Sequence, residues 1–178
     1  AFDHHVSETE RISTQNCKNL IIDQNARSAA AVVYQYYGGK KVFGDKISGE
    51  LMAAVDKGDS ADFTIDEIVN PSGWVLLHFL MDARTGLGRF HDFRISNYDL
   101  MMELIDYCRN HSISEILALP DVKERVDLYF TQQDNFIEQI KRVHRMEGRI
   151  IVIDLRGEKT IYCGNRFLVF AMYPDVQL

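Results

Sequence analysis

The sequence contains few of the residues that break or cross-link a fold. Only three of its 178 residues are proline, while 46% are hydrophobic and 26% are charged, so disorder and collagen-like structure are excluded. The three cysteines, Cys17, Cys108 and Cys163, are widely separated and form no Cys-x-x-Cys pair. They therefore indicate neither a zinc site nor redox chemistry, and we expect idle or buried thiols.

Long apolar runs are absent too. No run approaches the roughly 18 to 20 residues that span a bilayer, and residues 1–10 are acidic and histidine-rich instead of basic and then apolar. We therefore expect a cytoplasmic protein without a membrane partner. The formal net charge of −6 opposes binding to long nucleic acid, but it is compatible with short anionic substrates held by metal ions.

The apolar pattern predicts alternating strands and helices in the first third of the chain. Residues 19–23 have the pattern of a short buried strand, and residues 28–37 that of a helix with an alanine-rich face. A second helix is expected at residues 45–57, ended by Gly58. This alternation predicts an α/β fold with a parallel sheet.

Helical patterns dominate the middle of the chain. Residues 72–81 are almost wholly apolar and suit a buried helix. Ser96 and Ser112 are each followed three residues later by an acidic residue, a spacing typical of a capping box, so they predict the starts of two more helices. Pro120 opens the longest helix, which we expect to continue to residue 147.

A β pattern follows the long helix. Gly148 is expected to end that helix, and strands are expected at residues 149–155, 160–163 and 167–173. Two or three short strands are seldom stable without more sheet or a covering helix, so these residues are interpreted as the start of a second lobe.

Asp3, His4 and His5 give the sharpest chemical signal. A neutral imidazole and a carboxylate are both good ligands for divalent transition metals such as Mn²⁺. Neighbouring residues on a strand face opposite ways, so a loop at a strand end would let one histidine bind metal while the other faces a phosphate. Asp3 would then orient a histidine. From three residues alone, a surface tripeptide explains the pattern equally well.

The segments around this triplet resemble the third motif of the DHH phosphoesterase family. The matching stretches are AFDHHVS at residues 1–7, the strand that ends in IID at residues 21–23, and ARSAAAVVY at residues 26–34. The family includes RecJ-like exonucleases, family II inorganic pyrophosphatases, nanoRNases and exopolyphosphatase-related proteins, and the resemblance is best to the last group. It implies that His4 is a metal ligand and that His5 contacts the scissile phosphate.

The stretch LMAAVD at residues 51–56 resembles the family's fourth motif. It implies that Asp56 is a further metal ligand, with Asp59 as the alternative. Two ions, Mn²⁺ or Mg²⁺, would lower the pKa of a bridging water and neutralise the phosphoryl oxygens. The family's first two ligand motifs would precede Asp3, and its glycine-rich substrate motif would follow Leu178. The segment is therefore expected to carry part of the di-metal site.

The resemblance also implies an architecture and a function. Residues 1–120 would form the C-terminal part of a largely helical DHH domain, residues 121–148 a connecting helix, and residues 149–178 the start of a β-rich DHH-associated domain. The parent protein would be a metal-dependent hydrolase of phosphoester or phosphoanhydride bonds, acting on polyphosphate, a short oligonucleotide or a cyclic dinucleotide. The segment alone would have little or no activity. The competing hypothesis is a non-catalytic binding or regulatory module on a degenerate DHH scaffold. The oligomeric state stays open, a homodimer included.

Arg84 and Arg89 flank the glycines of the stretch RTGLGR. Two guanidinium groups beside flexible glycines could hold a substrate phosphate through paired hydrogen bonds, which makes both arginines candidate substrate-binding residues. The alternative is a turn between helices with solvated arginines, because a single Gly-x-Gly is a weak signal.

Overall fold

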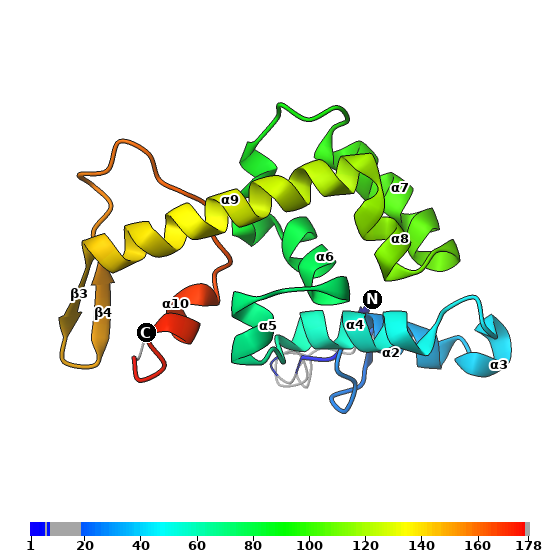
Figure 1. The fold of residues 1–178 in the computed structure, drawn as a ribbon. Coiled ribbons are helices and arrows are strands. Elements are labelled where there is room, and N and C mark those ends of the chain that lie inside the picture. Colours follow the sequence, from blue (N-terminus) through cyan, green and yellow to red (C-terminus); the bar gives the residue numbers. More distant parts are fainter. Residues whose placement is uncertain (6, 8–18, 177–178) are drawn as a thin grey trace. The chain divides into compact units, whose positions relative to one another are not determined.

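A computed structural model describes residues 1–5, 7 and 19–176 and has mixed helix and sheet, with helices predominating (Figure 1). The chain forms two compact units, Ala1–Phe63 and Thr64–Leu178. The boundary between the two compact units therefore follows residue 63. The domain boundaries expected at residues 120 and 148 stay a prediction. The described helices include none that combines the length and apolar character needed to cross a bilayer. Cys17 lies outside the described residues.

The first unit contains a pair of short parallel strands. β1 (Phe2–Asp3) pairs with β2 (Ile21–Ile22), with Phe2 opposite Ile21 and Asp3 opposite Ile22. The strand expected at residues 19–23 is therefore confirmed. Because the two strands run in the same direction, the residues that follow β1 and β2 leave the sheet at the same edge.

Two helices accompany these strands. α2 (Ala29–Tyr36) packs against β1 and α4 (Gly49–Ser60), and the short α3 (Lys40–Phe43) lies between α2 and α4 in the chain. The Ser28 hydroxyl accepts the backbone N–H of Ala31, which caps α2 and confirms the helix expected at residues 28–37.

α4 begins and ends later than its sequence pattern indicated. Ser48 caps it by accepting the N–H of Leu51, and the helix continues to Ser60, where Ala61 adopts a left-handed conformation with φ of 53°. The expected end at Gly58 was wrong, because Gly58 is buried within the last turn. The backbone N–H of Asp62 bonds the carbonyl of Lys57 and closes the helix beyond that glycine.

The second unit begins as a group of helices. They are α5 (Ile65–Val69), α6 (Gly73–Met81), α7 (Asn97–Asn110), α8 (Ile113–Ala118) and α9 (Pro120–Val143). Two short 3₁₀ turns, η1 (Ala83–Thr85) and η2 (Leu87–Arg89), follow α6. α6 packs against α8 and α9, and the core includes the fully buried Phe79, Ile116 and Val122.

The sequence signals for these helices are confirmed. α6 matches the expected residues 72–81, and α9 opens with Pro120 in its first turn. Ser96 and Ser112 cap α7 and α8, and Ser112 forms a full capping box with Glu115. Each serine supplies an acceptor for a backbone N–H that the helix itself cannot satisfy.

The end of α9 differs from the expectation. The helix ends at Val143, and β3 (His144–Glu147) pairs in antiparallel with β4 (Ile150–Ile153), so the strand expected at residues 149–155 is confirmed (Figure 1). Gly148, which was expected to end the helix, instead lies in the hairpin turn with φ of 64°. This left-handed conformation costs glycine little, and it suits a tight hairpin turn.

The last predicted strand is wrong as well. Residues 167–173 contain a helix, α10 (Leu168–Met172), and residues 160–163 have no strand assignment. The Asn165 side chain accepts the N–H of Phe167 and starts the turn, while Leu168 is fully buried and α10 packs against α5. Short apolar runs do not distinguish strand from helix by periodicity, so packing decides the outcome here.

Candidate metal and phosphate site

The triplet lies at the carboxyl end of β1, in the first unit. Asp3 Oδ1 accepts the backbone N–H groups of His4, at 2.7 Å, and His5, at 3.2 Å, and it lies 2.7 Å from Nδ1 of the His5 ring. These contacts hold the two imidazole rings with their centroids 4.3 Å apart. In the described part of the chain, Asp3, His4 and His5 are the group whose ligand atoms are close enough to hold one metal ion, all lying within 4.8 Å of one another.

The Asp3 carboxylate stays ionised at any ordinary pH. The hydrogen bond with the His5 side chain, followed by the bond from the His5 backbone, lowers the pKa of Asp3 to about 2. Asp3 therefore has a negative charge that fixes the turn and engages Nδ1 of His5. The contact is compatible with the orienting role expected of Asp3, which stays a prediction.

His4 is the more enclosed of the two histidines. Its side chain is 14% exposed, and its Nδ1 is buried without a hydrogen-bond partner among the described residues. Asp59 Oδ2 lies 3.8 Å from that nitrogen. This separation is too long for a hydrogen bond. Two ligands that each lie about 2.1 Å from one ion are about 3.0 to 3.4 Å apart at ordinary coordination angles, so these two atoms would have to approach each other by a few tenths of an ångström to share an ion.

A row of three aspartates on α4 and just beyond it contacts the start of α2. The spacing of three residues places Asp56, Asp59 and Asp62 on one side, and each contacts a different one of three successive residues. Arg27 forms an ion pair with Asp62, the Ser28 hydroxyl donates to Asp56 Oδ1 at 2.6 Å, and the Ala29 N–H donates to Asp59 Oδ2 at 3.3 Å.

The two candidate metal ligands of α4 have different partners in this row. Asp56, which the sequence favoured, is engaged by the hydroxyl of Ser28, a fully buried residue. Asp59, the alternative, is the aspartate whose carboxylate approaches His4. Sequence reasoning did not identify Ser28 as part of this arrangement, although its position at a helix cap beside an aspartate row three residues apart is a usable signal.

The donor set fits a divalent cation. It combines an enclosed imidazole nitrogen without a hydrogen-bond partner in the described part of the chain, a nearby carboxylate and an ionised aspartate in the adjoining turn. Nitrogen and carboxylate ligands together suit Mn²⁺ and related ions, and carboxylates suit Mg²⁺. His4 and Asp59 are the residues that would hold such an ion.

Arg84 and Arg89 both have partners within the second unit. Arg84 Nε donates to Asp82 at 2.8 and 3.1 Å; burial of Asp82 favours its neutral form, but the bonds from Arg84 outweigh this and lower the pKa of Asp82. Arg89 donates to the carbonyl oxygen of Ile161. Both contacts agree with the structural interpretation of the RTGLGR turn, and the phosphate clamp stays a prediction.

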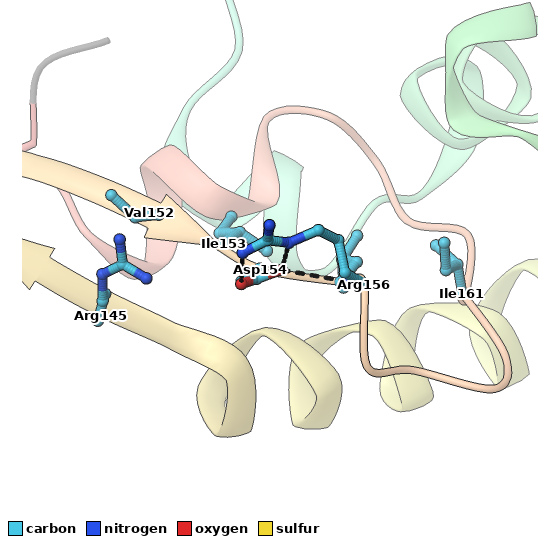
Figure 2. Close-up of a pocket in the computed structure, with 7 residues that line it drawn as sticks. Arg145, Val152, Ile153, Asp154, Arg156 and Ile161 are labelled. Carbon is cyan, nitrogen blue, oxygen red and sulfur yellow. Dashed lines mark hydrogen bonds and ion pairs between the residues drawn. The ribbon is translucent and has the colours of Figure 1, made fainter.

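A hollow beside the β3–β4 hairpin is the other candidate (Figure 2). It is lined by Val152, Ile153, Ile161 and two arginines. Arg156 donates to both carboxylate oxygens of Asp154, at 2.9 and 2.7 Å, and this contact lowers the pKa of Asp154. Arg145 Nε donates one hydrogen bond to Glu147 Oε1, at 2.9 Å. Because both cations are neutralised locally, the hollow is a weaker candidate for an anion site than the triplet is for a metal site.

The chain matches the solved structure of a pGpG-specific phosphodiesterase, PggH from Vibrio cholerae. The two are 52% identical, with a TM-score of 0.82, and the match covers 98% of this chain and 55% of that chain. The similarity is to a phosphodiesterase. The chain spans about half the length of PggH. A scan against models of known families gave no match, and neither did a search of curated proteins.

This similarity bears on part of what the sequence predicted. It supports the prediction of a hydrolase that acts on phosphoester bonds, since that is the class to which PggH belongs. Membership of the DHH family, the metal ions and the roles of individual residues stay predictions.

Proposed function

We propose that this chain is part of a DHH-type phosphodiesterase that depends on divalent metal ions and cleaves a short linear dinucleotide such as pGpG. The observation that carries the proposal is the 52% identity to a pGpG-specific phosphodiesterase over nearly the whole chain. The enclosed Nδ1 of His4, which has no hydrogen-bond partner among the described residues and lies 3.8 Å from Asp59 Oδ2, supports the metal dependence.

Each residue of the site has a distinct task in this proposal. His4 and Asp59 hold a divalent ion, since the His4 nitrogen is enclosed and the Asp59 carboxylate lies 3.8 Å from it. Asp3 fixes the orientation of the His5 ring through Nδ1, and His5 contacts a phosphate oxygen of the substrate. A metal ion held there would supply charge neutralisation at the phosphoryl oxygens and would lower the pKa of a bound water.

A dinucleotide is preferred over polyphosphate as the substrate. PggH is described as specific for pGpG, and half of its length is matched at 52% identity. Hydrolysis adds one water across the phosphodiester bond of pGpG and yields two molecules of pG. Because this chain spans about half of PggH, we propose that it contributes one part of the site and has little or no turnover by itself.

A chimera tests the proposal. This chain replaces the matching segment of PggH, and release of pG from pGpG is measured with and without Mn²⁺. We expect manganese-dependent release, and its loss in the variant His4→Ala. A chimera that melts cooperatively near the temperature of PggH, but releases no pG with Mn²⁺ or Mg²⁺, would refute the proposal. Polyphosphate offered in place of pGpG tests the substrate choice.

A further inference from the structure

α7 exposes an apolar surface although it already contributes to the core. Leu100 and Leu104 are buried on its inner side, with 1% and 6% of their surface exposed. On the outer side are four large apolar residues with between 49% and 70% of their surface exposed, spaced three, four and seven residues from the first. They form the stripe Tyr98, Met101, Met102 and Ile105.

An acidic row lies beside this stripe on the same helix. Asp99, Glu103 and Asp106 are all exposed, and their spacing of four and three residues places them along one line. Arg109 is the basic residue of α7, and it lies 3.8 Å from Asp106. The outer side of α7 therefore has an apolar stripe with excess negative charge along one flank.

The stripe borders a hollow that can take a large side chain. Met101 lines this hollow together with Leu80, Met81 and Leu87, and its volume is about 190 Å³. Methionine side chains adapt to the shape of a partner because they are unbranched and polarisable. An apolar anchor seated in a pocket at the centre of a contact, with polar residues around it, is the usual arrangement of a binding hot spot.

We propose that the stripe on α7 is a docking surface for an amphipathic helix of another protein, whose apolar face is flanked by lysine or arginine. The spacing of the stripe matches the way one helix packs along another. The acidic row selects for basic flanks, because opposite charges across an interface favour binding and like charges oppose it. This surface lies outside the proposed catalytic residues and requires no metal ion.

The acidic row also disfavours two other partners, a second copy of α7 and an anionic membrane. In an antiparallel pair of α7 helices related by a two-fold axis, the same flanks face each other, so the acidic row would lie against itself. An anionic membrane surface would be repelled by the same three carboxylates. A basic helix gains from the feature that disfavours both alternatives.

Two matched peptides test the proposal on the 178-residue chain. Both are helical and have the same leucine stripe with one tryptophan; one is flanked by lysines and the other by glutamates. We expect the lysine peptide to bind at least about 10-fold more tightly in fluorescence anisotropy, with the difference shrinking as salt is raised. The variants Met101→Asp and Ile105→Asp should each weaken it about 10-fold or more. Val42→Asp, at a residue 65% exposed outside α7, should leave it unchanged.

Charge reversal gives the second arm. Replacing both Glu103 and Asp106 by lysine should reverse the preference, so that the glutamate peptide binds more tightly. Equal binding of the two peptides, or binding that survives Met101→Asp, would overturn the proposal. Dimers of the chain that Met101→Asp converts to monomers in light scattering would assign the stripe to a second copy instead. Sedimentation with phosphatidylserine vesicles that depends on Met101 would assign it to a membrane.

Discussion

Asp59 and Asp56 lie one turn apart on α4, and we predict different effects of replacing them. Substitution of Asp59 should mainly weaken metal binding, whereas substitution of Asp56 should mainly lower the stability of the fold. In Asp59→Asn the side chain keeps its size and loses its charge. The affinity for Mn²⁺ should fall at least about 10-fold, because even indirect partners of metal ligands are worth 10- to 100-fold. Broadening of the His4 ring signals by paramagnetic Mn²⁺ measures this in the 178-residue chain.

The stability effect of Asp59→Asn should be small. The carboxylate accepts one long bond, 3.3 Å, from the first turn of α2, and its side chain is 43% exposed. A charge in such a place is worth about 0.3 to 1 kcal/mol. At roughly 2 to 4 °C per kcal/mol for a chain of this size, Tm falls by at most about 4 °C.

Asp56→Ala should lower the stability of the fold and leave the affinity for Mn²⁺ nearly unchanged. Ser28 is fully buried, and its hydroxyl loses the 2.6 Å bond to Asp56 Oδ1. An unsatisfied buried donor costs about 1 to 3 kcal/mol, which corresponds to a fall in Tm of roughly 2 to 12 °C. The affinity for Mn²⁺ should change less than threefold. Ser28→Ala, alone and combined with Asp56→Ala, serves as control: Ser28→Ala removes the bond to Asp56 together with the cap of α2, so the two losses of stability should be less than additive in the double variant. If Asp56→Ala weakens Mn²⁺ binding as much as Asp59→Asn and leaves Tm unchanged, our assignment of the two residues is wrong.

Three further predictions follow from the second unit, the Asp3 turn and the extent of the chain. The pKa of Asp3 is lowered to about 2 in the folded state, so its stabilising effect is present above pH 4 and is lost as the pH falls through 2. The Tm difference between Asp3→Asn and the parent should therefore shrink over this range and vanish only below pH 2 in calorimetry. Gly86→Ala should lower Tm more than Gly148→Ala: both glycines have positive φ, but a Cβ at Gly86 would lie 2.9 Å from Cys163 Sγ, whereas nothing lies within 4 Å at Gly148. The 178-residue chain with Mn²⁺ should release no measurable pG from pGpG, and robust turnover in chromatography would contradict the division of the site that we propose.

The starts of α2, α7 and α8 and the strand β2 could be predicted because their signals are local. Ser28, Ser96 and Ser112 satisfy nearby backbone N–H groups through their own side chains, so the sequence alone locates them. The triplet could be identified because its three ligands are adjacent. The turn that gathers them involves only Asp3, His4 and His5.

Features that depend on packing could not be predicted in the same way. The choice between Asp56 and Asp59 depends on how α4 is rotated against α2, which neither helix encodes locally. The run that forms α10 has the composition of a strand, and its helical state depends on the burial of Leu168 and the contact with α5. The end of α9 at Val143 depends on pairing between β3 and β4.

The three successive contacts between the start of α2 and the aspartates of α4 fix how far the two helices are shifted along each other. A shift of α4 by one turn, about 5.4 Å, would bring Asp56 to the place of Asp59 and Asp59 to that of Asp62, but it would bring Ala53 opposite Ser28 and leave the Ser28 hydroxyl without its acceptor. Register is thus set by side chains and not by the length of the connection. Insertions between residues 44 and 47 should therefore lengthen the loop without displacing the carboxylate that approaches His4.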